Sequence, residues 1–410
     1  MSLGITPKLL SNCRSQDLFL ALLDTAVVDA RMQFKVSGTS FTVGSRLHEP
    51  LPNPNDVVIR VHRQRFFTRL LCYGNLGLGE AYMARDFEVE QGTLQDFLTI
   101  LLRNRLDQRL KQQPRLALQL WALQLANAWR GKWQNVQRHY DLGDDLFEAF
   151  LDPTLTYSCG YVYTPADSLQ ELQRHKLERI CRKLRLQSGD RLLDVGCGYG
   201  GLLIYAARNY GVTGYGLTIS RQHFERGQAN ITKAGLAESV QIAYQDYWAV
   251  TGTFDKVVSV GMMEHLPRRE YARYFSTLSK VLTPQGVGLV HMIGCTTRTI
   301  THDPFIQKYI FPGSSQVRLS DIARHLECRH LIILDVENIA RHYAYTLQRW
   351  FERFQLHRAT LDAARYDDRF VRMWEYYLCC GIAAASVADA AVYQVLFTKD
   401  QATLPPLQRV

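Results

Sequence analysis

From residue 190 onward, short apolar runs alternate with longer amphipathic stretches. Five of the runs have the length and composition of strands: RLLDV, GYGLTI, VQIAYQ, FDKVVSV and VGLVHMI. A final helix and strand are expected within GIAAASVADAAVYQVLF. Strands that alternate with helices build a mainly parallel, doubly wound sheet. The pattern therefore predicts an α/β fold whose ligand site lies beyond the carboxyl ends of the strands.

The first 110 residues follow a different pattern. The β-like runs FKVSGTSFTVG and DVVIRVH mix with the helical runs FFTRLLCYG and LQDFLTILLRN. This mixture predicts a small α+β domain over residues 1–110. We expect an amphipathic linker over residues 111–138 and a larger α/β domain over residues 139–410, which begins with HYDLGDDLFEAFLD and a helix at about residues 168–186.

The composition is ordinary for a globular protein, with 47% hydrophobic and 21% charged residues among 410. No apolar run reaches the roughly 18 residues needed to span a bilayer, and the N-terminus lacks the pattern of a secretory signal. Nine cysteines without a CxxC pair indicate reduced thiols rather than a disulfide framework. These features predict a cytoplasmic protein.

The net charge of +9 is unevenly distributed along the chain. Between Arg103 and Arg138, eight basic residues accompany one acid, Asp107, and leucines and tryptophans are interleaved with them. Such a segment is typical of a helix on an anionic membrane surface. The alternative is a solvated linker helix whose tryptophans pack on the next domain, and no nucleic acid partner is expected. The residues concerned are Arg103, Arg105, Arg109, Lys111, Arg115, Arg130, Lys132 and Arg138, with Trp121, Trp129 and Trp133.

Three glycines follow the first strand of the large domain in the pattern D-x-G-x-G-x-G, which begins at Asp194. A dinucleotide would need an acidic residue at the tip of the second strand, where GLTIS has no carboxylate. Acids stand instead before the glycines and at the tip of the third strand, Asp246. An acid there can accept from an adenine amine, and the amino acid end of S-adenosylmethionine (SAM) lies near the loop. The arrangement favours SAM over a dinucleotide or a turn without a ligand.

Motifs in six places resemble those of the cyclopropane fatty acid synthases: HYDLGDDLFEAFLDPTLTYSCGYVY, LLDVGCGYGG, GLTIS, FDKVVSVGMMEHL, VGLVHMIG and FIQKYIFPG. The resemblance covers about residues 130–400 and, more loosely through LGLGEAYMARDFE, the N-terminal domain of the phospholipid-acting members. It implies a Rossmann-like, class I SAM-dependent methyltransferase fold. Residues 139–410 would then form the catalytic domain.

The resemblance also implies a reaction, in which a methylene group from SAM is added across the cis double bond of an unsaturated acyl chain in a membrane phospholipid. Bound bicarbonate would be the base. The implied partners are these acyl chains and an anionic membrane surface, with the protein peripherally associated with its inner face; a homodimer is left open. Methyl attack on an alkene leaves a carbocation, which aromatic faces can stabilise. Tyr157, Tyr161 and Tyr343 are candidates for that role.

In the resembled family, bicarbonate is held by two backbone groups and three side chains. Carried over to this sequence, the backbone groups belong to Cys159 and Ile293, and the side chains are those of Glu264, His291 and Tyr343. Glu264 would orient the ion and relay its proton. The alternatives are a solvated surface acid at Glu264, a core histidine at His291 and a small buried residue at Cys159. No metal ligand is assigned.

The SAM contacts of the family map onto the strand tips and the YSC motif. They are Tyr157, Ser158, Asp194, Gly196, Gly198, Gly200, Thr218, Ser220, His223, Gln245 and Asp246. Two positions depart from the family pattern: His223 stands where Gln is usual, and Pro267 where Gly is common. These departures affect substrate detail rather than the class of reaction.

The sequence is also compatible with two other functions. A fatty acyl C-methyltransferase would form the same cation and lose a different proton, which gives a methyl- or methylene-branched chain. A non-catalytic lipid-binding protein could keep the fold without the reaction. The joint retention of Cys159, Glu264, His291 and Tyr343 argues against the second of these.

Overall fold

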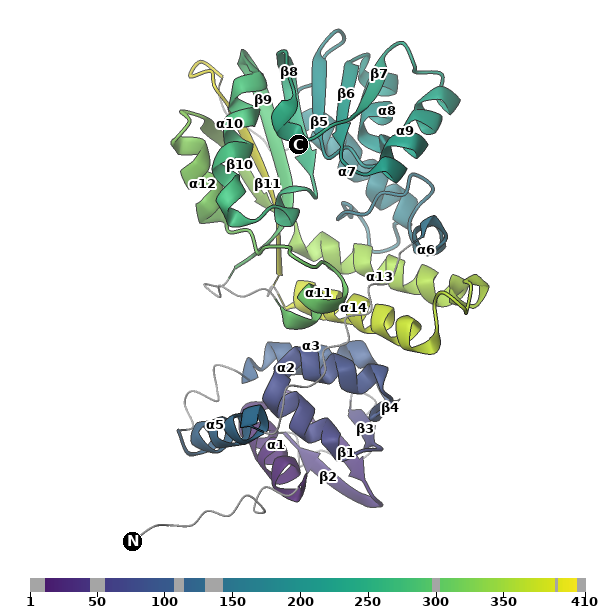
Figure 1. The fold of residues 1–410 in the computed structure, drawn as a ribbon, viewed down its shortest axis with the longest axis vertical. Coiled ribbons are helices and arrows are strands. Elements are labelled where there is room, and N and C mark those ends of the chain that lie inside the picture. The colour runs from purple at the N-terminus through teal and green to yellow at the C-terminus, as the bar shows by residue number, and fades with distance from the viewer. Residues whose placement is uncertain are drawn as a thin grey trace. The chain divides into compact units, whose positions relative to one another are not determined.

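The computed structural model describes residues 12–44, 56–106, 114–129, 143–296, 303–387 and 390–403 (Figure 1). The chain divides into two compact units. Unit 1 comprises residues 1–141, 303–312 and 361–387, and unit 2 comprises residues 142–302, 313–360 and 388–410.

This division differs from the boundary expected from the sequence, which assigned all of residues 139–410 to one domain. Helices α11 (Pro304–Tyr309) and α14 (Asp368–Ser386) belong to unit 1. The reason is burial: α14 packs against helices α2 (Arg65–Met83) and α3 (Leu94–Arg103), and Phe370 and Trp374 on it are almost fully buried. A hydrophobic pattern shows that a helix has an apolar face, but it does not show which element covers that face.

Unit 1 has the mixed α+β character predicted from the sequence. Its described strands form a sheet in the order β2-β1-β3-β4, with β1 and β3 parallel and the other pairs antiparallel. Ser37 and Gly38 both have positive φ, as the tight hairpin turn between β1 and β2 requires. The remaining elements are β1 (Met32–Val36), β2 (Thr39–Val43), β3 (Val57–Val61), β4 (Phe87–Gln91), α1 (Asn12–Ala26) and α5 (Pro114–Trp129).

Unit 2 contains a sheet in the order β10-β11-β9-β8-β5-β6-β7 among the described residues. The pairs from β9 through β8, β5 and β6 to β7 are parallel, and β11 is antiparallel to both of its neighbours. The strands are β5 (Arg191–Val195), β6 (Thr213–Thr218), β7 (Val240–Tyr244), β8 (Phe254–Val260), β9 (Leu282–Cys295), β10 (Ile332–Asn338) and β11 (Ala390–Thr398). The five predicted strands and the doubly wound sheet are confirmed.

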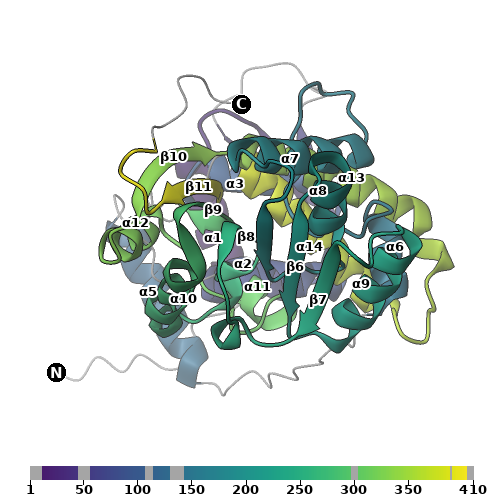
Figure 2. The same cartoon turned by 90° about the horizontal axis from the view of Figure 1, so that it is seen from above.

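Helices cover both faces of this sheet (Figures 1 and 2). Successive strand residues point to opposite faces, so Leu192 joins a core with α7, α8 and α9, whereas Leu193 joins a core with α10 and α12. The helices of this unit are α6 (Asp144–Phe150), α7 (Leu169–Lys183), α8 (Gly201–Tyr210), α9 (Arg221–Lys233), α10 (Tyr271–Val281), α12 (Leu319–Glu327) and α13 (Ala340–His357). Short 3₁₀ turns are η2 (Tyr247–Ala249), η3 (Met263–His265), η4 (Arg268–Glu270) and η5 (Arg358–Thr360).

The strand order reverses direction at β5, which pairs with β6 on one side and β8 on the other. In open α/β sheets, ligands bind beyond the carboxyl ends of the strands at such a reversal. The candidate ligand site therefore lies among the residues that follow β5, β6, β7, β8 and β9.

Candidate active site

The loop after β5 has the backbone of a ligand cradle. Gly196, Gly198 and Gly200 have φ of +84°, +53° and +82°, a region that residues with a side chain rarely adopt. A Cβ at Gly196 would lie 2.9 Å from Met262, whereas a Cβ at Gly198 would meet nothing within 4 Å. The position of a Cβ at Gly198 is thus open space.

Asp194, at the end of β5, is a buried carboxyl group. Burial raises its pKa to about 7, although the nearby Lys176 ammonium acts in the opposite direction. Its Oδ1 atom has no hydrogen-bond partner among the described residues. A buried polar atom without a partner is costly, and a cationic ligand group would remove that cost.

Lys176, on α7, is a buried residue that the sequence analysis did not single out. Its Nζ donates to Ser158 Oγ at 2.8 Å and to Gln173 Oε1 at 2.7 Å. Burial lowers the pKa of this ammonium to about 8. Lys176 therefore fixes the side chain of Ser158, a predicted SAM contact.

The predicted residues after β6 and β7 lie together, and several have a structural task there. The Ser220 hydroxyl caps α9 by accepting from the His223 amide at 3.2 Å. Thr218 Oγ1 accepts from the Ser220 amide, and the Gln245 amide donates to the Thr218 carbonyl at 2.9 Å. The half-buried His223 ring packs edge-on against Tyr199, with centroids 4.6 Å apart. Asp246 follows at the start of η2.

Large hydrophobic side chains near these strand ends are exposed. Ile219 is 70% exposed and Trp248, in η2, is 49% exposed. Arg273 lies over the Trp248 ring at 4.4 Å. Trp248 stands two positions after Asp246, and an aromatic residue so close to a strand-tip acid is the sequence signal that could have identified it.

Glu264, in η3, is buried rather than a solvated surface acid. Its Oε1 accepts from the Ile293 amide at 3.2 Å, and its Oε2 has no partner among the described residues. Burial raises the pKa of this carboxyl to about 7, although backbone hydrogen bonds act to lower it. A Cβ at Gly261 would lie 3.9 Å from Glu264 Oε1 and 3.9 Å from Ser158 Cβ, so the YSC motif and Glu264 flank the same glycine.

The YSC motif is attached to α13. The Gly160 amide donates to Thr346 Oγ1 at 3.0 Å, and the Val162 amide donates to His342 Nδ1 at 3.0 Å. Tyr343 lies on the same helix and is buried. Burial raises the pKa of the Cys159 thiol to about 12, so Cys159 is not a thiolate nucleophile at neutral pH.

The aromatic candidates separate into two groups. Tyr157 packs against Trp350 with centroids 5.0 Å apart, and Tyr343 packs against the same ring at 6.1 Å. Tyr161, in contrast, is stacked on His342 at 3.9 Å and has the Arg179 guanidinium 3.9 Å from its ring centroid.

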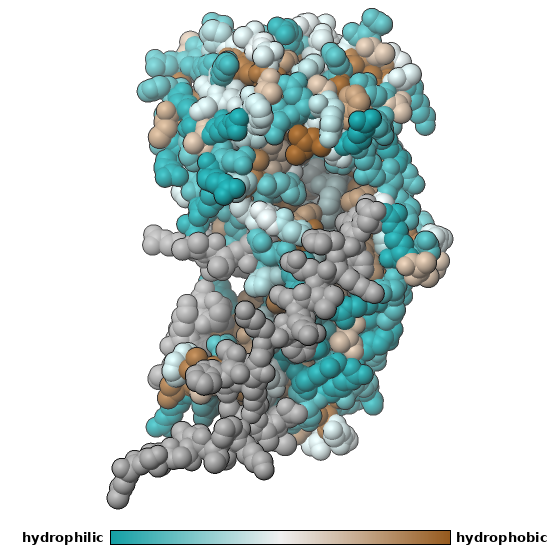
Figure 3. Space-filling model, in the orientation of Figure 1, coloured by the Kyte–Doolittle hydropathy of each residue, from teal (hydrophilic) through white to brown (hydrophobic). Residues whose placement is uncertain are grey.

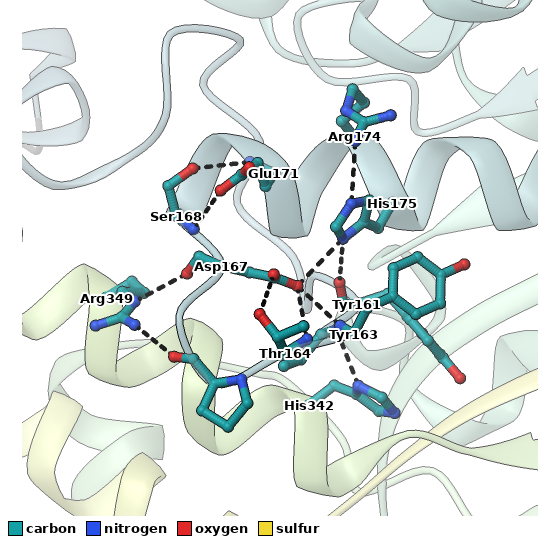
Figure 4. Close-up of polar contacts among 12 residues, drawn as sticks. Tyr161, Tyr163, Thr164, Asp167, Ser168, Glu171, Arg174, His175, His342 and Arg349 are labelled. Atoms are coloured by element: carbon teal, nitrogen blue, oxygen red, sulfur yellow. Dashed lines mark hydrogen bonds and ion pairs between the residues drawn. The ribbon is translucent and has the colours of Figure 1, made fainter.

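Two groups at that distance must occupy opposite faces, so Tyr161 has no face available for a carbocation. The expectation for Tyr161 is therefore wrong. Figure 4 shows the surrounding loop: Asp167 accepts from Thr164 and contacts His175, while Arg349 donates to the carbonyls of Pro165 and Asp167. This region fixes the backbone that leads from the YSC motif to α7.

Comparison with known proteins identifies the family. Residues 127–395 match the family described as mycolic acid cyclopropane synthetase. The chain belongs to this family.

Individual members resemble the chain over most of its length. It is 39% identical over 343 residues to the cyclopropane-fatty-acyl-phospholipid synthase of Escherichia coli K12, covering 83% of this chain and 87% of the relative. It is 33% identical to the tuberculostearic acid methyltransferase UfaA1 of Mycobacterium tuberculosis, covering 83% of each. The structure of the mycolic acid cyclopropane synthase CmaA1 complexed with SAH and CTAB matches with a TM-score of 0.59 and 29% identity, over 65% of this chain and 99% of that one.

The family assignment confirms an enzyme of the SAM-dependent methyltransferase class with a class I fold. The residues present fit SAM. The open space at Gly198 leaves room for a ligand. The partnerless Asp194 oxygen is an acceptor for a cationic group, and the exposed Trp248 ring offers an aromatic face.

Proposed function

We propose that this protein is a cyclopropane-fatty-acyl-phospholipid synthase, which adds a methylene group from SAM across the cis double bond of an unsaturated acyl chain in a membrane phospholipid. The observation that carries the proposal is the environment of Glu264, which is buried beside the YSC motif with one oxygen on the Ile293 amide and the other without a partner among the described residues. The relative of that name in Escherichia coli supports the choice of substrate class.

Bicarbonate would be held by the backbone of Cys159 and Ile293 and the side chains of Glu264, His291 and Tyr343. The buried, partnerless Glu264 Oε2 fits an ion with a hydrogen-bonding hydroxyl group. The ion supplies the base that removes a proton from the transferred methyl group. The Ile293 amide donates to Glu264 here, so bicarbonate and Glu264 would share this donor.

The side chains of the site have distinct tasks. SAM supplies the methyl group, and the Gly196–Gly200 loop with Asp194 would hold its amino acid end. The Tyr157 and Tyr343 rings, both packed on Trp350, would face the cation that develops on the acyl chain. Glu264, with its pKa near 7, can hold or release a proton at Oε2 near neutral pH.

We also propose that α5 contacts the membrane. Along this helix Leu118, Trp121 and Leu125 are 64%, 58% and 41% exposed and recur at helical spacing, while Leu123 is buried. Figure 3 shows hydrophobic atoms on the drawn face at the position of α5. Arg115, near the start of the helix, is exposed.

A stripe of this kind with basic residues beside it fits peripheral binding to the inner face of an anionic membrane. Arg109, Lys111, Arg130, Lys132, Arg138 and Trp133 lie outside the described residues. None of the described helices is long and apolar enough to cross a bilayer. The homodimer that the sequence left open is not part of this proposal.

A branched-chain product is the second candidate, favoured by the similarity to a tuberculostearic acid methyltransferase. Cells that express the protein should be grown with methyl-deuterated methionine and their fatty acids examined by mass spectrometry. The proposal expects unsaturated chains to gain one carbon with two deuteriums, together with the upfield proton signals of a cyclopropane ring. A product that has gained the same carbon as a methylene branch (C=CH₂) or as a saturated methyl branch would establish the C-methyltransferase instead.

A further inference from the structure

His291 faces a glutamine across the sheet. β9 and β11 are antiparallel, and His291 is paired in register with Gln394. Both side chains are buried, and Gln394 Nε2 lies 3.2 Å from His291 Nδ1. The other ring nitrogen, Nε2, makes no hydrogen bond within the part of the chain that the structure describes.

The orientation of the Gln394 amide is set by Lys183. Lys183, the last residue of α7, is buried, and its Nζ lies 2.8 Å from Gln394 Oε1 and 2.6 Å from Glu337 Oε2. An ammonium has three donors and no acceptor. The atom of Gln394 that faces Lys183 must therefore be the carbonyl oxygen, which leaves the amide NH₂ group to face His291.

Lys183 forms an ion pair with Glu337, a carboxylate that Arg179 also contacts. Burial acts to raise the pKa of Glu337, but hydrogen bonds from Lys183 and Arg179 and their charges keep it below its ordinary value. Arg179 Nη2 lies 3.1 Å from Glu337 Oε2, so the carboxylate has two cationic partners. Asp335, also on β10, lies 3.6 Å from Lys183 Nζ.

The amide NH₂ group is a donor, so the nitrogen that it meets must be an acceptor. Burial and the two nearby ammonium groups, Lys176 and Lys183, lower the pKa of His291 to about 3, so the ring is neutral. A neutral imidazole has one donor and one acceptor nitrogen. Since Nδ1 accepts, the proton lies on Nε2.

We propose that Gln394 is a positioning residue and that Lys183 and Gln394 together fix the Nε2–H tautomer of His291, so that the ring presents a donor to the anionic base of the reaction. The inference rests on the proposed function, because that function supplies the anion. The other tautomer would turn a lone pair toward the anion, and the two would repel each other. Outer-shell partners that hold a tautomer are known to influence ligand affinity and activity in this way.

The tautomer can be read in the parent protein by NMR of ¹⁵N-labelled histidine, with the His291 signals assigned from a His291→Asn variant. The proposal expects a protonated Nε2 and an unprotonated Nδ1. A protonated Nδ1 in the parent protein would overturn it, and this reading needs no variant at position 394.

Gln394→Glu tests the mechanism. A carboxylate has no donor, so it can accept from Lys183 and from His291 only if Nδ1 carries a proton, and in the neutral ring that proton comes from Nε2. The ¹⁵N signals should exchange, and kcat should fall about 10- to 100-fold, the loss expected for one hydrogen bond to a charged group, while SAM affinity stays unchanged. Gln241→Glu, at an exposed position on β7 of the same sheet, adds the same charge and should leave the signals and kcat as they are.

An unchanged tautomer in Gln394→Glu, or unchanged kcat with an exchanged tautomer, would overturn the proposal. A failure of the proposed function is a separate result: the parent protein would then show the expected Nε2–H tautomer but add no carbon to unsaturated lipids. The two ideas can therefore fail independently.

Discussion

Replacing Glu264 with glutamine should stabilise the ligand-free protein in alkaline buffer while it removes most of the activity. The carboxyl is buried, and its pKa is raised from 4.5 to about 7. A proton is thus bound more tightly in the folded state than in the unfolded state, so the stability from this group is present below pH 4.5 and is lost as the pH rises through about 7. The shift corresponds to about 3 kcal/mol.

Glutamine keeps the shape and the acceptor for the Ile293 amide but carries no charge at any pH. At about pH 5 the parent protein holds Glu264 protonated, so the two proteins should have nearly equal stability; at about pH 8.5 the variant should be more stable by roughly 1–3 kcal/mol. Thermal melts of both proteins at the two pH values measure how much the stability difference between variant and parent changes with pH. Asp194 is also buried, but it is present in both proteins, so its contribution cancels.

Turnover of the variant should fall by about 10²- to 10⁴-fold, because glutamine cannot relay a proton, whereas SAM affinity should stay near that of the parent. Added bicarbonate should not restore the activity. Glu238→Gln, at an exposed position, is the matched control and should leave both the stability and the activity close to those of the parent. A gain that is equal at both pH values would refute the assignment of Glu264 as a buried charge, and full activity would refute its place in the bicarbonate site.

Three further predictions concern SAM and the membrane. Gly198→Val should abolish SAM binding in calorimetry. The control is Gly235→Val, at a glycine with a similarly positive φ and equally open space, which should lower stability but leave the SAM affinity intact. Equal SAM affinities in the two variants would remove the loop from the site. Burial lowers the pKa of His223 from its ordinary value of 6.5, so its ring is neutral at pH 7. SAM affinity should weaken as the pH falls through the pKa of this ring, and His223→Gln should flatten that dependence. Identical pH profiles for the two proteins would exclude a contact between His223 and SAM. Each basic residue near an anionic surface should contribute about 1 kcal/mol of attraction at low ionic strength. Salt screens this attraction, so binding to anionic vesicles should decrease steeply as the salt concentration rises. A variant with five basic residues changed to glutamine should show weak vesicle binding in cosedimentation and unchanged SAM affinity in calorimetry. Unchanged vesicle binding would make the segment a linker. The five residues are Arg109, Lys111, Arg115, Arg130 and Lys132.

The parts of the fold that the sequence predicted are those with a strong local pattern. The five strands from β5 to β9 have apolar runs, and the glycines after β5 have a spacing that few structures other than a ligand loop require. β10 was not predicted, since most of its residues are only half-buried and Asp335 and Glu337 interrupt its pattern. The placement of α14 in unit 1 could not be predicted, because it depends on long-range packing rather than on the helix itself.

The charged residues behind the site were missed for a related reason. Lys176 and Lys183 stand seven residues apart on an amphipathic helix, where lysines usually form a solvated face. In the structure both are buried and point to polar groups of other segments, Ser158 for one and Gln394 for the other. The identity of such partners is a property of the folded sheet, because neither spacing nor composition links α7 to the YSC motif or to β11.

Asp194 and Glu264 are two buried carboxyls to which the proposed function gives different tasks. Burial raises the pKa of both carboxyls, but Lys176 lowers that of Asp194, while only backbone hydrogen bonds do so for Glu264. Both pKa values are nevertheless raised to about 7, and at Asp194 a cationic amine would favour the ionised form and remove the cost of its partnerless oxygen. At Glu264 the proposed bicarbonate would hydrogen-bond to the partnerless Oε2, where the carboxyl can hold or release a proton. Two carboxyls with similarly raised pKa values, near the carboxyl ends of the neighbouring strands β5 and β8, would thus differ in role through the ligand that each meets.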